Sequence, residues 1–296
     1  MGKIEDLLQK KRDAALNPEE LAALTAFLRL NIFDVLHSRQ TGHWGGASSA
    51  LEIVTALYFN RLKIDPSKPE WEDRDRFILS KGHASLNLYA VLAHRGFFPT
   101  QDLPSFRVFG SKLQGHPSMR KLKGVDMSTG ALGHGLSIGV GLALAARIAG
   151  KNFYTYVLSG EGCLDEGSTW EALLYAAKTK PKGLVYLIDY NKVQLDGTIS
   201  EILPLEPLAD KIKSFGWNLA PKSYDGNNTK QILEAFDWID SDAVWPKAII
   251  FDTIKGKGVS FMEGKNAWHG APIDDDSYAK GRPELAADLK KKEAAL

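Results

Sequence analysis

The sequence has little cysteine, almost no excess charge of either sign and no long hydrophobic run. Its one cysteine, Cys163, has no partner for an internal disulfide, and cysteine pairs with metal-ligand spacing are missing, which excludes a disulfide scaffold and a zinc ribbon. The 37 basic and 36 acidic side chains leave a net charge of +1, which disfavours nucleic acid as a partner. No window reaches about 18 apolar residues, and the charged N-terminus lacks the apolar stretch of a secretory signal. We therefore expect a cytoplasmic protein without a membrane span.

Hydrophobic residues make up 44% of the 296 positions, which is typical of a globular protein with a sizeable core. Residues 19–38 place apolar side chains at helical spacing after Asn17 and Pro18, a plausible cap and first helical position. This pattern predicts a long N-terminal amphipathic helix. Glycine-rich residues 40–46 interrupt the pattern, which resumes over 47–62. Two helices should therefore flank a loop that carries His43.

From residue 76 onward, short β-rich runs alternate with helical stretches, which predicts parallel strands joined by crossover helices. The expected strands are 76–80, 153–160, 183–190 and 247–254, and the expected helices are 84–96, 132–150 and 166–180. The strands are largely apolar, as when helices cover both faces of a sheet. We expect a doubly wound, mostly parallel α/β sheet in a single domain over residues 1–296. A Lys- and Ala-rich tail from about residue 280 is expected to be loosely held.

Such sheets bind ligands beyond the carboxyl ends of their strands, and polar residues occur at these ends. Glu161 lies between two glycines directly after one predicted strand, and Asn191 directly follows the next. Residues 163–190 separate the second glycine from Asn191, which is one helix and one strand, so neighbouring strand ends can bring both side chains to one point. Carboxylate and amide oxygens suit Mg²⁺, and flanking glycines let the backbone approach phosphate closely. These residues predict a magnesium–diphosphate anchor.

Seven segments in order resemble the transketolase family, whose thiamine diphosphate motif is Gly-Asp-Gly, a similar spacer and then Asn. The match runs from about residue 20 to about residue 275, with Glu161 in place of the usual Asp. Singly, each segment has an ordinary explanation as a turn, a cap or core packing; the ordered set favours the family. The segments are 76–85 (RFILSKGHAS), 115–117 (GHP), 124–143 (GVDMSTGALGHGLSIGVGLA), 162–172 (GCLDEGSTWEA), 189–197 (DYNKVQLDG), 253–263 (TIKGKGVSFME) and 268–272 (WHGAP).

The resemblance implies a thiamine diphosphate-binding fold, specifically its diphosphate-binding domain, with thiamine diphosphate and Mg²⁺ (or Ca²⁺ or Mn²⁺) as cofactors. In transketolases this region is followed by a pyrimidine-binding domain and a C-terminal domain, which we expect to be absent from this protein and carried by a partner chain. Split enzymes of the family divide these parts between two chains. We therefore expect the N-terminal subunit of a split transketolase, whose partner is a C-terminal subunit in an α2β2 heterotetramer. The partner should supply the glutamate that activates the aminopyrimidine of the cofactor.

The resemblance also implies roles for individual residues. The expected metal ligands are Glu161, Asn191 and the backbone carbonyl of Val193. The expected cofactor-binding residues are His83, Gly130, Ala131, Leu132, Gly162, Glu166, Asn191 and His269. The expected catalytic residues are His43, His83, His116, His269 and Glu166, where Glu166 resembles the residue that connects active sites across the dimer. Imidazoles can hydrogen-bond sugar hydroxyls and move protons at neutral pH.

Three positions depart from the family pattern. Glu161 carries one methylene more than Asp, and Mg²⁺ tolerates little error in its ligand distances. Trp44 stands where Pro is common, from which we expect a narrower or differently shaped channel mouth. His134 replaces Gln in a turn expected to lie close to the thiazolium, where it would change the polarity.

The leading functional hypothesis is transfer of a two-carbon ketol unit from a ketose or ketose phosphate to an aldose. A first alternative is related ketol or acyl transfer in a specialised sugar, sulfosugar or secondary-metabolite pathway. A second is a non-catalytic assembly subunit that has lost the cofactor because Glu161 cannot hold magnesium. A nucleotide-binding dehydrogenase is disfavoured, because no GxGxxG follows the first strand with an acidic residue about 20 positions later.

Overall fold

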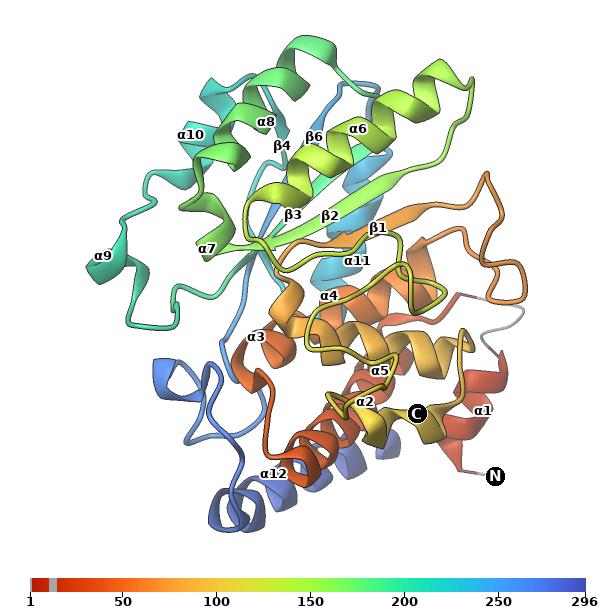
Figure 1. Cartoon of the computed structure of the whole chain (residues 1–296), viewed down its shortest axis with the longest axis vertical. Helices are drawn as coiled ribbons and strands as arrows, with labels where there is room; N and C mark the ends of the chain where they lie inside the picture. The colour runs from red at the N-terminus through yellow and green to blue at the C-terminus, as the bar shows by residue number, and fades with distance from the viewer. Residues whose placement is uncertain (1, 11–14) are drawn as a thin grey trace.

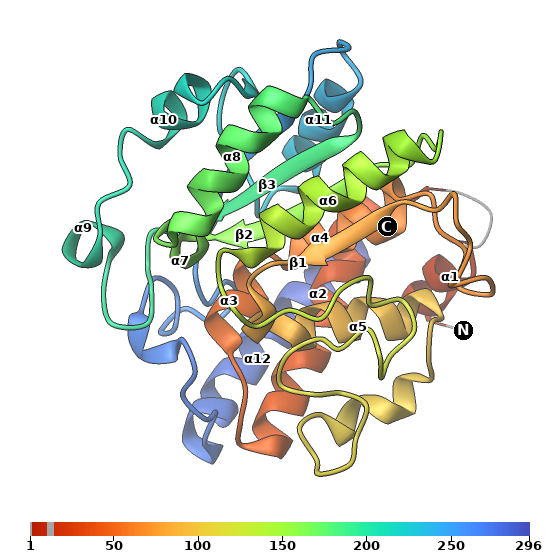
Figure 2. The same cartoon turned by 45° about the horizontal axis from the view of Figure 1, so that its top comes forward.

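The computed structural model describes residues 2–10 and 15–296, and this part forms a six-stranded sheet covered by helices on both faces (Figures 1 and 2). The strand order is β1-β2-β3-β6-β4, β5 also pairs with β6, and all these pairs are parallel. The predicted parallel α/β fold is therefore confirmed. The strands are β1 (Arg76–Leu79), β2 (Thr155–Gly160), β3 (Leu184–Tyr190), β4 (Asn218–Leu219), β5 (Tyr224–Asp225) and β6 (Lys247–Asp252).

The central strand β3 shows why the sheet is covered on both sides. All seven of its residues are buried, but successive side chains point to opposite faces. Val185 and Leu187 join the core beneath the N-terminal helices, whereas Tyr186 and Ile188 join the core beneath α6 and α8. The first face carries α2 (Pro18–Arg39), α4 (Leu51–Ala56), α5 (Ser85–Arg95) and α11 (Thr229–Ile239); the second carries α6 (His134–Ile148), α8 (Gly167–Thr179) and α10 (Leu208–Ser214).

The long helix α2 begins and ends close to its predicted limits. Asn17 caps it by accepting a hydrogen bond from the Glu20 amide, the Glu20 carboxylate accepts one from the Asn17 amide, and Pro18 occupies the first turn. The helix is long and apolar enough to cross a membrane, but 61% of its most apolar window is buried inside the protein. It therefore behaves as the core helix of a globular fold.

The helix predicted over 47–62 is divided into three. After α3 (Trp44–Ser49) and α4 comes a π-helical turn, η1 (Leu57–Arg61). Every residue of α3 and α4 is buried. The remaining elements are α1 (Lys3–Lys10), α7 (Glu161–Leu164), α9 (Ile199–Ile202), α12 (Asp275–Ala294) and the 3₁₀ turns η2 (Gly82–Ala84), η3 (Thr100–Ser105) and η4 (Asn266–Trp268).

The prediction of a loosely held tail from about residue 280 was wrong. The segment belongs to α12, which Asp274 caps and which lies along α2 (Figure 1). Leu285 is buried against the core, and Arg282 and Tyr278 both donate hydrogen bonds to Asp34 of α2. Lys and Ala are strong helix formers, so the composition that suggested a loose tail is equally compatible with a helix. This helix needs few apolar residues, because it packs on the core along one side only.

Candidate active site

The carboxyl ends of β2 and β3 meet at a buried acid, Asp189, which lies beside Gly160 in the register of the two strands. Asp189 accepts a hydrogen bond from Ser49 over 2.7 Å, and it also pairs with the Lys81 ammonium and the Thr253 hydroxyl. These partners come from α3, from the loop after β1 and from the loop after β6. One carboxylate therefore ties together four segments at the strand ends, on the left in Figure 1.

Glu161 and Asn191, the two expected side-chain ligands of the metal, lie at these adjacent strand ends. The Glu161 side chain is buried and its Oε1 accepts a hydrogen bond from the backbone amide of Lys192, the residue after Asn191. Burial, and then the nearby Asp189, raise the pKa of Glu161 to about 8. A buried acid next to another acid is an environment that favours a bound cation.

A cation already lies against the third expected ligand. The Lys255 ammonium donates to the carbonyl oxygens of Val193 over 2.8 Å and Gln194 over 3.1 Å. It lies 2.7 Å from Nδ1 of His269, and burial lowers the pKa of Lys255 to about 8, so the amine is still mostly protonated at pH 7. An ammonium has only donors, so Nδ1 of His269 accepts and the proton of the neutral ring is on Nε2.

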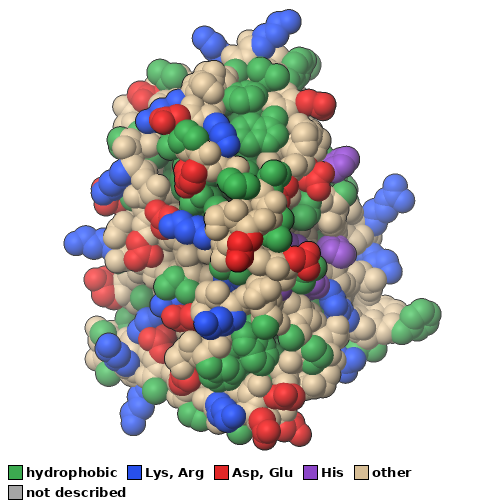
Figure 3. Space-filling model, turned by 90° about the vertical axis from the view of Figure 1, so that its left-hand side faces the viewer, with side chains coloured by type: hydrophobic (Ala, Val, Ile, Leu, Met, Phe, Trp, Pro, Cys, Tyr) green, Lys and Arg blue, Asp and Glu red, His purple; other side chains and the backbone are tan. Residues whose placement is uncertain are grey.

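Three of the four predicted histidines form one cluster. The ring centroids of His43 and His83 are 5.1 Å apart, those of His83 and His269 are 5.0 Å apart, and those of His43 and His269 are 5.4 Å apart. Figure 3, which views the molecule from the left-hand side of Figure 1, shows histidine side chains at one margin of this face. The rings come from the start of α3, from η2 and from the segment after η4, which are far apart in the sequence.

These histidines are neutral at physiological pH. Burial, followed by Arg107, lowers the pKa of His43 to about 4, and burial with Lys255 lowers that of His269 to about 3. Burial also holds the pKa of His83 well below its usual value, with His269 as the next cause. Each ring therefore offers one donor and one acceptor nitrogen, which suits hydrogen bonding to hydroxyl and carbonyl groups.

The expected diphosphate turn lies beside the cluster. Gly130, at φ +150°, lies against the ring of His116, because a Cβ at position 130 would be 3.1 Å from it. Gly82 packs on the same turn, where a Cβ would be 2.8 Å from the Gly130 amide nitrogen. On the other side, the Leu132 side chain would be 3.3 Å from a Cβ at Gly162. The turn 130–132 therefore bridges His116 and the start of α7.

Comparisons with known proteins agree with this geometry. Residues 21–293 match the family model described as transketolase, thiamine diphosphate binding domain. The chain belongs to the transketolase family. It is 43% identical over 244 residues to the 6-deoxy-6-sulfo-D-fructose transketolase subunit SqwG of Clostridium sp. (strain MSTE9), covering 82% of this chain and 88% of that protein. It is 38% identical to one subunit of the apulose-4-phosphate transketolase of Phocaeicola vulgatus, covering 90% of this chain and 93% of that one.

Solved transketolases share the fold. The transketolase of Campylobacter jejuni superposes with a TM-score of 0.83 at 28% identity, over 93% of this chain and 46% of that chain. The present chain thus spans about half the length of the solved transketolases it matches, while it spans most of the length of the two relatives that are named as subunits. The family's cofactor, thiamine diphosphate, belongs with the matched domain.

One residue that departs from the transketolase pattern lies elsewhere than expected. Trp44 is 1% exposed and packs edge-on against Phe33, so it is a core residue and the expectation that it shapes the channel mouth was wrong. The apolar ring is more favourably buried than exposed, even though its indole nitrogen has no hydrogen-bond partner among the described residues. His134 begins α6 and is exposed.

Glu166 also lies outside the histidine cluster. It precedes α8 as an exposed residue, and its Cβ would be 2.5 Å from a Cβ added at Gly133. It therefore occupies the gap between the first turns of α6 and α8. No group of three His, Cys, Asp or Glu side chains in residues 2–10 and 15–296 could hold a metal. Of the three expected metal ligands, Glu161 would be the charged one, since the other two are the side-chain amide of Asn191 and the backbone carbonyl of Val193.

Sequence reasoning missed four polar residues of this transketolase site: Lys81, Asp189, Lys255 and Arg107. The first three lie within the segments that resemble the family, and each follows or ends a strand, which was the available signal. Arg107 gave no such signal, because it lies in the irregular loop after η3.

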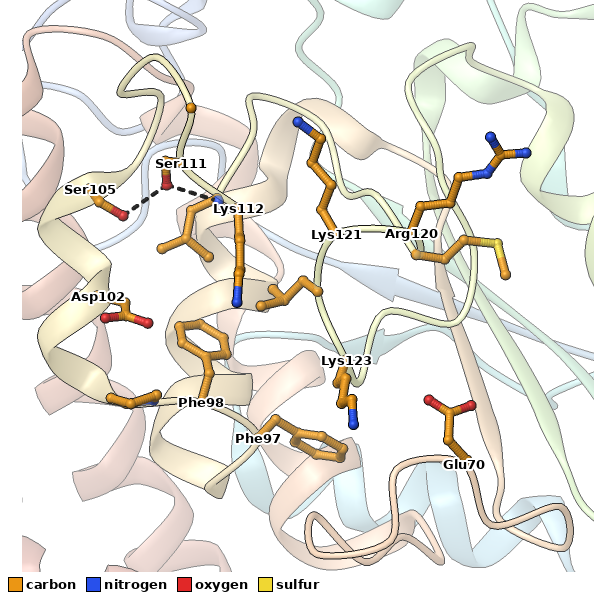
Figure 4. Close-up of a pocket in the computed structure, with 15 residues that line it drawn as sticks. Glu70, Phe97, Phe98, Asp102, Ser105, Ser111, Lys112, Arg120, Lys121 and Lys123 are labelled. Atoms are coloured by element: carbon orange, nitrogen blue, oxygen red, sulfur yellow. Dashed lines mark hydrogen bonds between the residues drawn. The ribbon is translucent and has the colours of Figure 1, made fainter.

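A cavity of about 740 Å³ lies apart from these residues (Figure 4). Its lining includes Phe97, Phe98 and Leu122, with the cations Lys112 and Lys123 at its border. Ser111 accepts a hydrogen bond from the Leu113 amide and pairs with Ser105, which stabilises the loop on one side of the cavity. None of the predicted site residues lines it.

Proposed function

We propose that this chain is the N-terminal subunit of a heteromeric transketolase that transfers a two-carbon ketol unit from a ketose or ketose phosphate to an aldose. The observation that carries the proposal is the meeting of Glu161, Asn191 and the Val193 carbonyl at adjacent strand ends, next to three neutral histidines. The two relatives named above support the reaction class. Residues 1–296 would form one diphosphate-binding domain in a cytoplasmic enzyme.

The metal would be Mg²⁺, or Ca²⁺ or Mn²⁺ in its place. Glu161, Asn191 and the Val193 carbonyl offer three hard oxygens, and diphosphate oxygens and water would complete the shell. The Val193 carbonyl oxygen already accepts a hydrogen bond from the Lys255 ammonium, so a metal ion would have to share this oxygen with that cation or displace it. The protein offers only three oxygen ligands, and one of them is charged. The metal should therefore bind together with the diphosphate, whose negative charge it needs.

The diphosphate would lie between the glycine turn and two buried lysines. Gly130, Ala131, Leu132 and Gly162 let the main chain approach it, while Lys81 and Lys255 provide positive charge. His83 and His269 lie beside these lysines and would contact the same group. When bound, thiamine diphosphate would supply a nucleophilic carbon and a thiazolium ring that stabilises the electron pair released as a carbon–carbon bond breaks.

The histidines would orient the sugar and move its protons. Since they are neutral, each can donate to a carbonyl or hydroxyl oxygen with one nitrogen and accept with the other. The Nε2–H of His269, fixed by Lys255, would donate to the substrate carbonyl. His116, which is exposed beside Gly130, would contact the substrate at the mouth of the channel together with His43.

The partner would be the C-terminal transketolase subunit, carrying the pyrimidine-binding half, in an α2β2 assembly. A surface that a partner would bury extends from the site along α6 and α8, where Ile148, Leu174 and Tyr175 are 85%, 60% and 54% exposed. Glu166 lies at the start of this surface, which supports its proposed role in connecting the active sites. Large exposed apolar side chains grouped on adjacent helices are typical of an interface.

The test is to purify the chain with the partner subunit, thiamine diphosphate and Mg²⁺, and to measure ketol transfer from a panel of ketoses and ketose phosphates. We expect turnover only when both chains are present. Absence of turnover with every donor, from a complex that forms and binds the cofactor, would contradict the proposal.

A second candidate is the same chemistry on a specialised sugar. It is favoured by the 43% identity to a protein named for 6-deoxy-6-sulfo-D-fructose. Including that sulfosugar and several 2-oxo acids in the panel separates the two, because preference for an ordinary ketose phosphate excludes the specialised substrate.

A further inference from the structure

Arg107 lies at the edge of the histidine cluster and bonds to the segment that carries His43. Its Nη1 donates to the Thr41 hydroxyl over 2.9 Å, and its Nη2 lies 3.3 Å from Nδ1 of His43. Its Nε is buried with no hydrogen-bond partner among the described residues. The planar fork of the guanidinium thus grips both ends of the short Thr41–His43 stretch, from a loop more than 60 residues away in the chain.

The neighbouring backbone and the Phe106 ring restrict the position of this guanidinium. Arg107 has φ +57°, a left-handed conformation that costs a non-glycine residue free energy. Gly115 faces it so closely that a Cβ there would be 2.9 Å from the Arg107 Nε. The side chain also lies along the Phe106 ring, with its Cζ 5.5 Å from the ring centroid. The position and direction of the guanidinium are therefore restricted on several sides.

The hydrogen bond to His43 has one consistent direction. A guanidinium carries five N–H donors and no acceptor, and it does not lose its proton in proteins. Nδ1 of His43 must then be the acceptor, so the ring is neutral and its proton is on Nε2. The Cδ2–Nε2 edge of the ring points to Gly270, where a Cβ would be 3.4 Å from Nε2.

We propose that Arg107 is a positioning residue that holds His43 as the neutral Nε2–H tautomer, with its single donor directed towards Gly270, the residue after His269 of the histidine cluster. The importance of this donor for ketol transfer rests on the proposed function, whereas the tautomer itself does not. With Lys255 acting on His269, two cations would then fix the donor nitrogens of two rings that lie edge to face.

Several other charged or titratable groups act on His43. The rings of His83 and His269 contact its ring. His116 and Lys255 act on it electrostatically, in addition to Arg107. Burial, Arg107, His116 and Lys255 disfavour a second proton on the ring, and of these groups Arg107 is the cation bonded to Nδ1. The choice of tautomer can therefore be assigned to Arg107 by removing it alone.

The experiment is ¹⁵N NMR of the full chain labelled at histidine, with the His43 signal assigned from a His43→Gln variant. In the wild type we expect a protonated Nε2 and an unprotonated Nδ1. Arg107→Met should give a mixture of tautomers and a raised His43 pKa, whereas Arg107→Lys, which keeps the charge without the fork, should restore the pKa in part. Arg39→Met is the matched control, because Arg39 bonds the Phe106 carbonyl in the same loop without touching His43.

A protonated Nδ1 in the wild type, or an unchanged tautomer in a folded Arg107→Met chain, would overturn the proposal. In the active complex, Arg107→Met should lower kcat at least tenfold with a smaller change in KM. If the complex has no ketol transfer activity at all, the proposed function fails while the NMR result still decides the tautomer.

Discussion

The ammonium of Lys255 donates a hydrogen bond to the main-chain carbonyl oxygen of Val193 across 2.8 Å. This places a fixed positive charge on an atom that we propose as a metal ligand. A divalent ion that binds alone must compete with this ammonium, whereas the diphosphate brings negative charge that favours both cations. Lys255 should therefore oppose the metal alone and support the metal–diphosphate complex.

Lys255→Met should bind Mn²⁺ several-fold more tightly than the wild type when thiamine diphosphate is absent, and should bind thiamine diphosphate at least tenfold more weakly when Mn²⁺ is present. Electron paramagnetic resonance of free Mn²⁺ and calorimetry measure the two affinities. Lys255→Arg keeps the charge and is the control. Weaker binding of Mn²⁺ alone by the Met variant would contradict the competition.

Glu161→Ala and Asn191→Ala should each abolish Mg²⁺-dependent binding of thiamine diphosphate, because each removes an oxygen ligand that water replaces poorly in a shell of fixed geometry. Calorimetry with and without Mg²⁺ checks this. Glu161→Asp tests the extra methylene: the family residue should retain binding if the loop can adjust. Failure of the wild type to bind thiamine diphosphate even with Mg²⁺ would favour the non-catalytic assembly role instead.

His43 and His269 should each make the free energy of unfolding smaller as the pH is lowered from about 6.5 towards 4, whereas Glu161, with its raised pKa, contributes in the opposite direction. The folded state depresses the pKa of His43 to about 4 and of His269 to about 3, from the ordinary histidine value of 6.5. Between these values the unfolded chain binds protons that the folded chain does not, so the free energy of unfolding decreases, while above pH 6.5 the contribution is fully present.

Urea unfolding between pH 7 and pH 4 measures this slope, and a His43→Gln, His269→Gln double variant should show a smaller one. Substitution of the exposed His134 serves as the control. An identical pH slope in the double variant and the wild type would mean that other groups cause the loss.

Two glycines of α6 should respond in opposite ways to alanine. At Gly139 a Cβ would be 2.3 Å from the Val157 side chain of β2, whereas at Gly141 there is nothing within 4 Å. Gly139→Ala should cost about 1–3 kcal/mol by overpacking the contact of α6 with the sheet. Gly141→Ala should stabilise the chain by up to about 1 kcal/mol through helix propensity. Urea midpoints of both variants decide, and equal midpoints would show that α6 moves freely away from the sheet.

Leu174→Glu should weaken the complex with the partner while the fold of the isolated chain stays unchanged. Leu174 is 60% exposed in the chain alone, so a charge there costs little until a partner desolvates it. Size-exclusion chromatography of the mixed chains measures assembly, and Leu203→Glu, at an exposed apolar residue outside α6 and α8, is the control. A complex unaffected by Leu174→Glu, or a stable dimer of this chain without the partner, would move the interface elsewhere or change its occupant.

The fold was largely predictable because local patterns specify it. The apolar run of β3, the alternation of strands and helices, and the Asn17 cap each act over a few residues. The tail was misjudged since its helix depends on Asp34 and the core of a segment about 250 residues away. Two short strands, β4 and β5, were missed because two residues carry no periodicity.

Residues of the candidate site could be predicted where they belong to a family motif. Residues whose role depends on a partner far away in the sequence could not. Glu161 and Asn191 could be placed together from strand order alone. The partners of Lys81, Lys255 and Arg107 lie between 14 and 108 positions away, and no local pattern encodes such pairs. Trp44 shows the converse case: its position in the sequence suggested a channel, but its large apolar ring is buried in the core.

The last helix, α12, contacts the first helix, α1: the Lys3 ammonium donates a hydrogen bond to the backbone carbonyl of Glu293 over 2.8 Å. In Figures 1 and 2 this contact lies on the side of the molecule opposite the strand ends. An affinity tag or fluorescent label joined at the C-terminus would thus project away from the strand ends that carry the candidate active site.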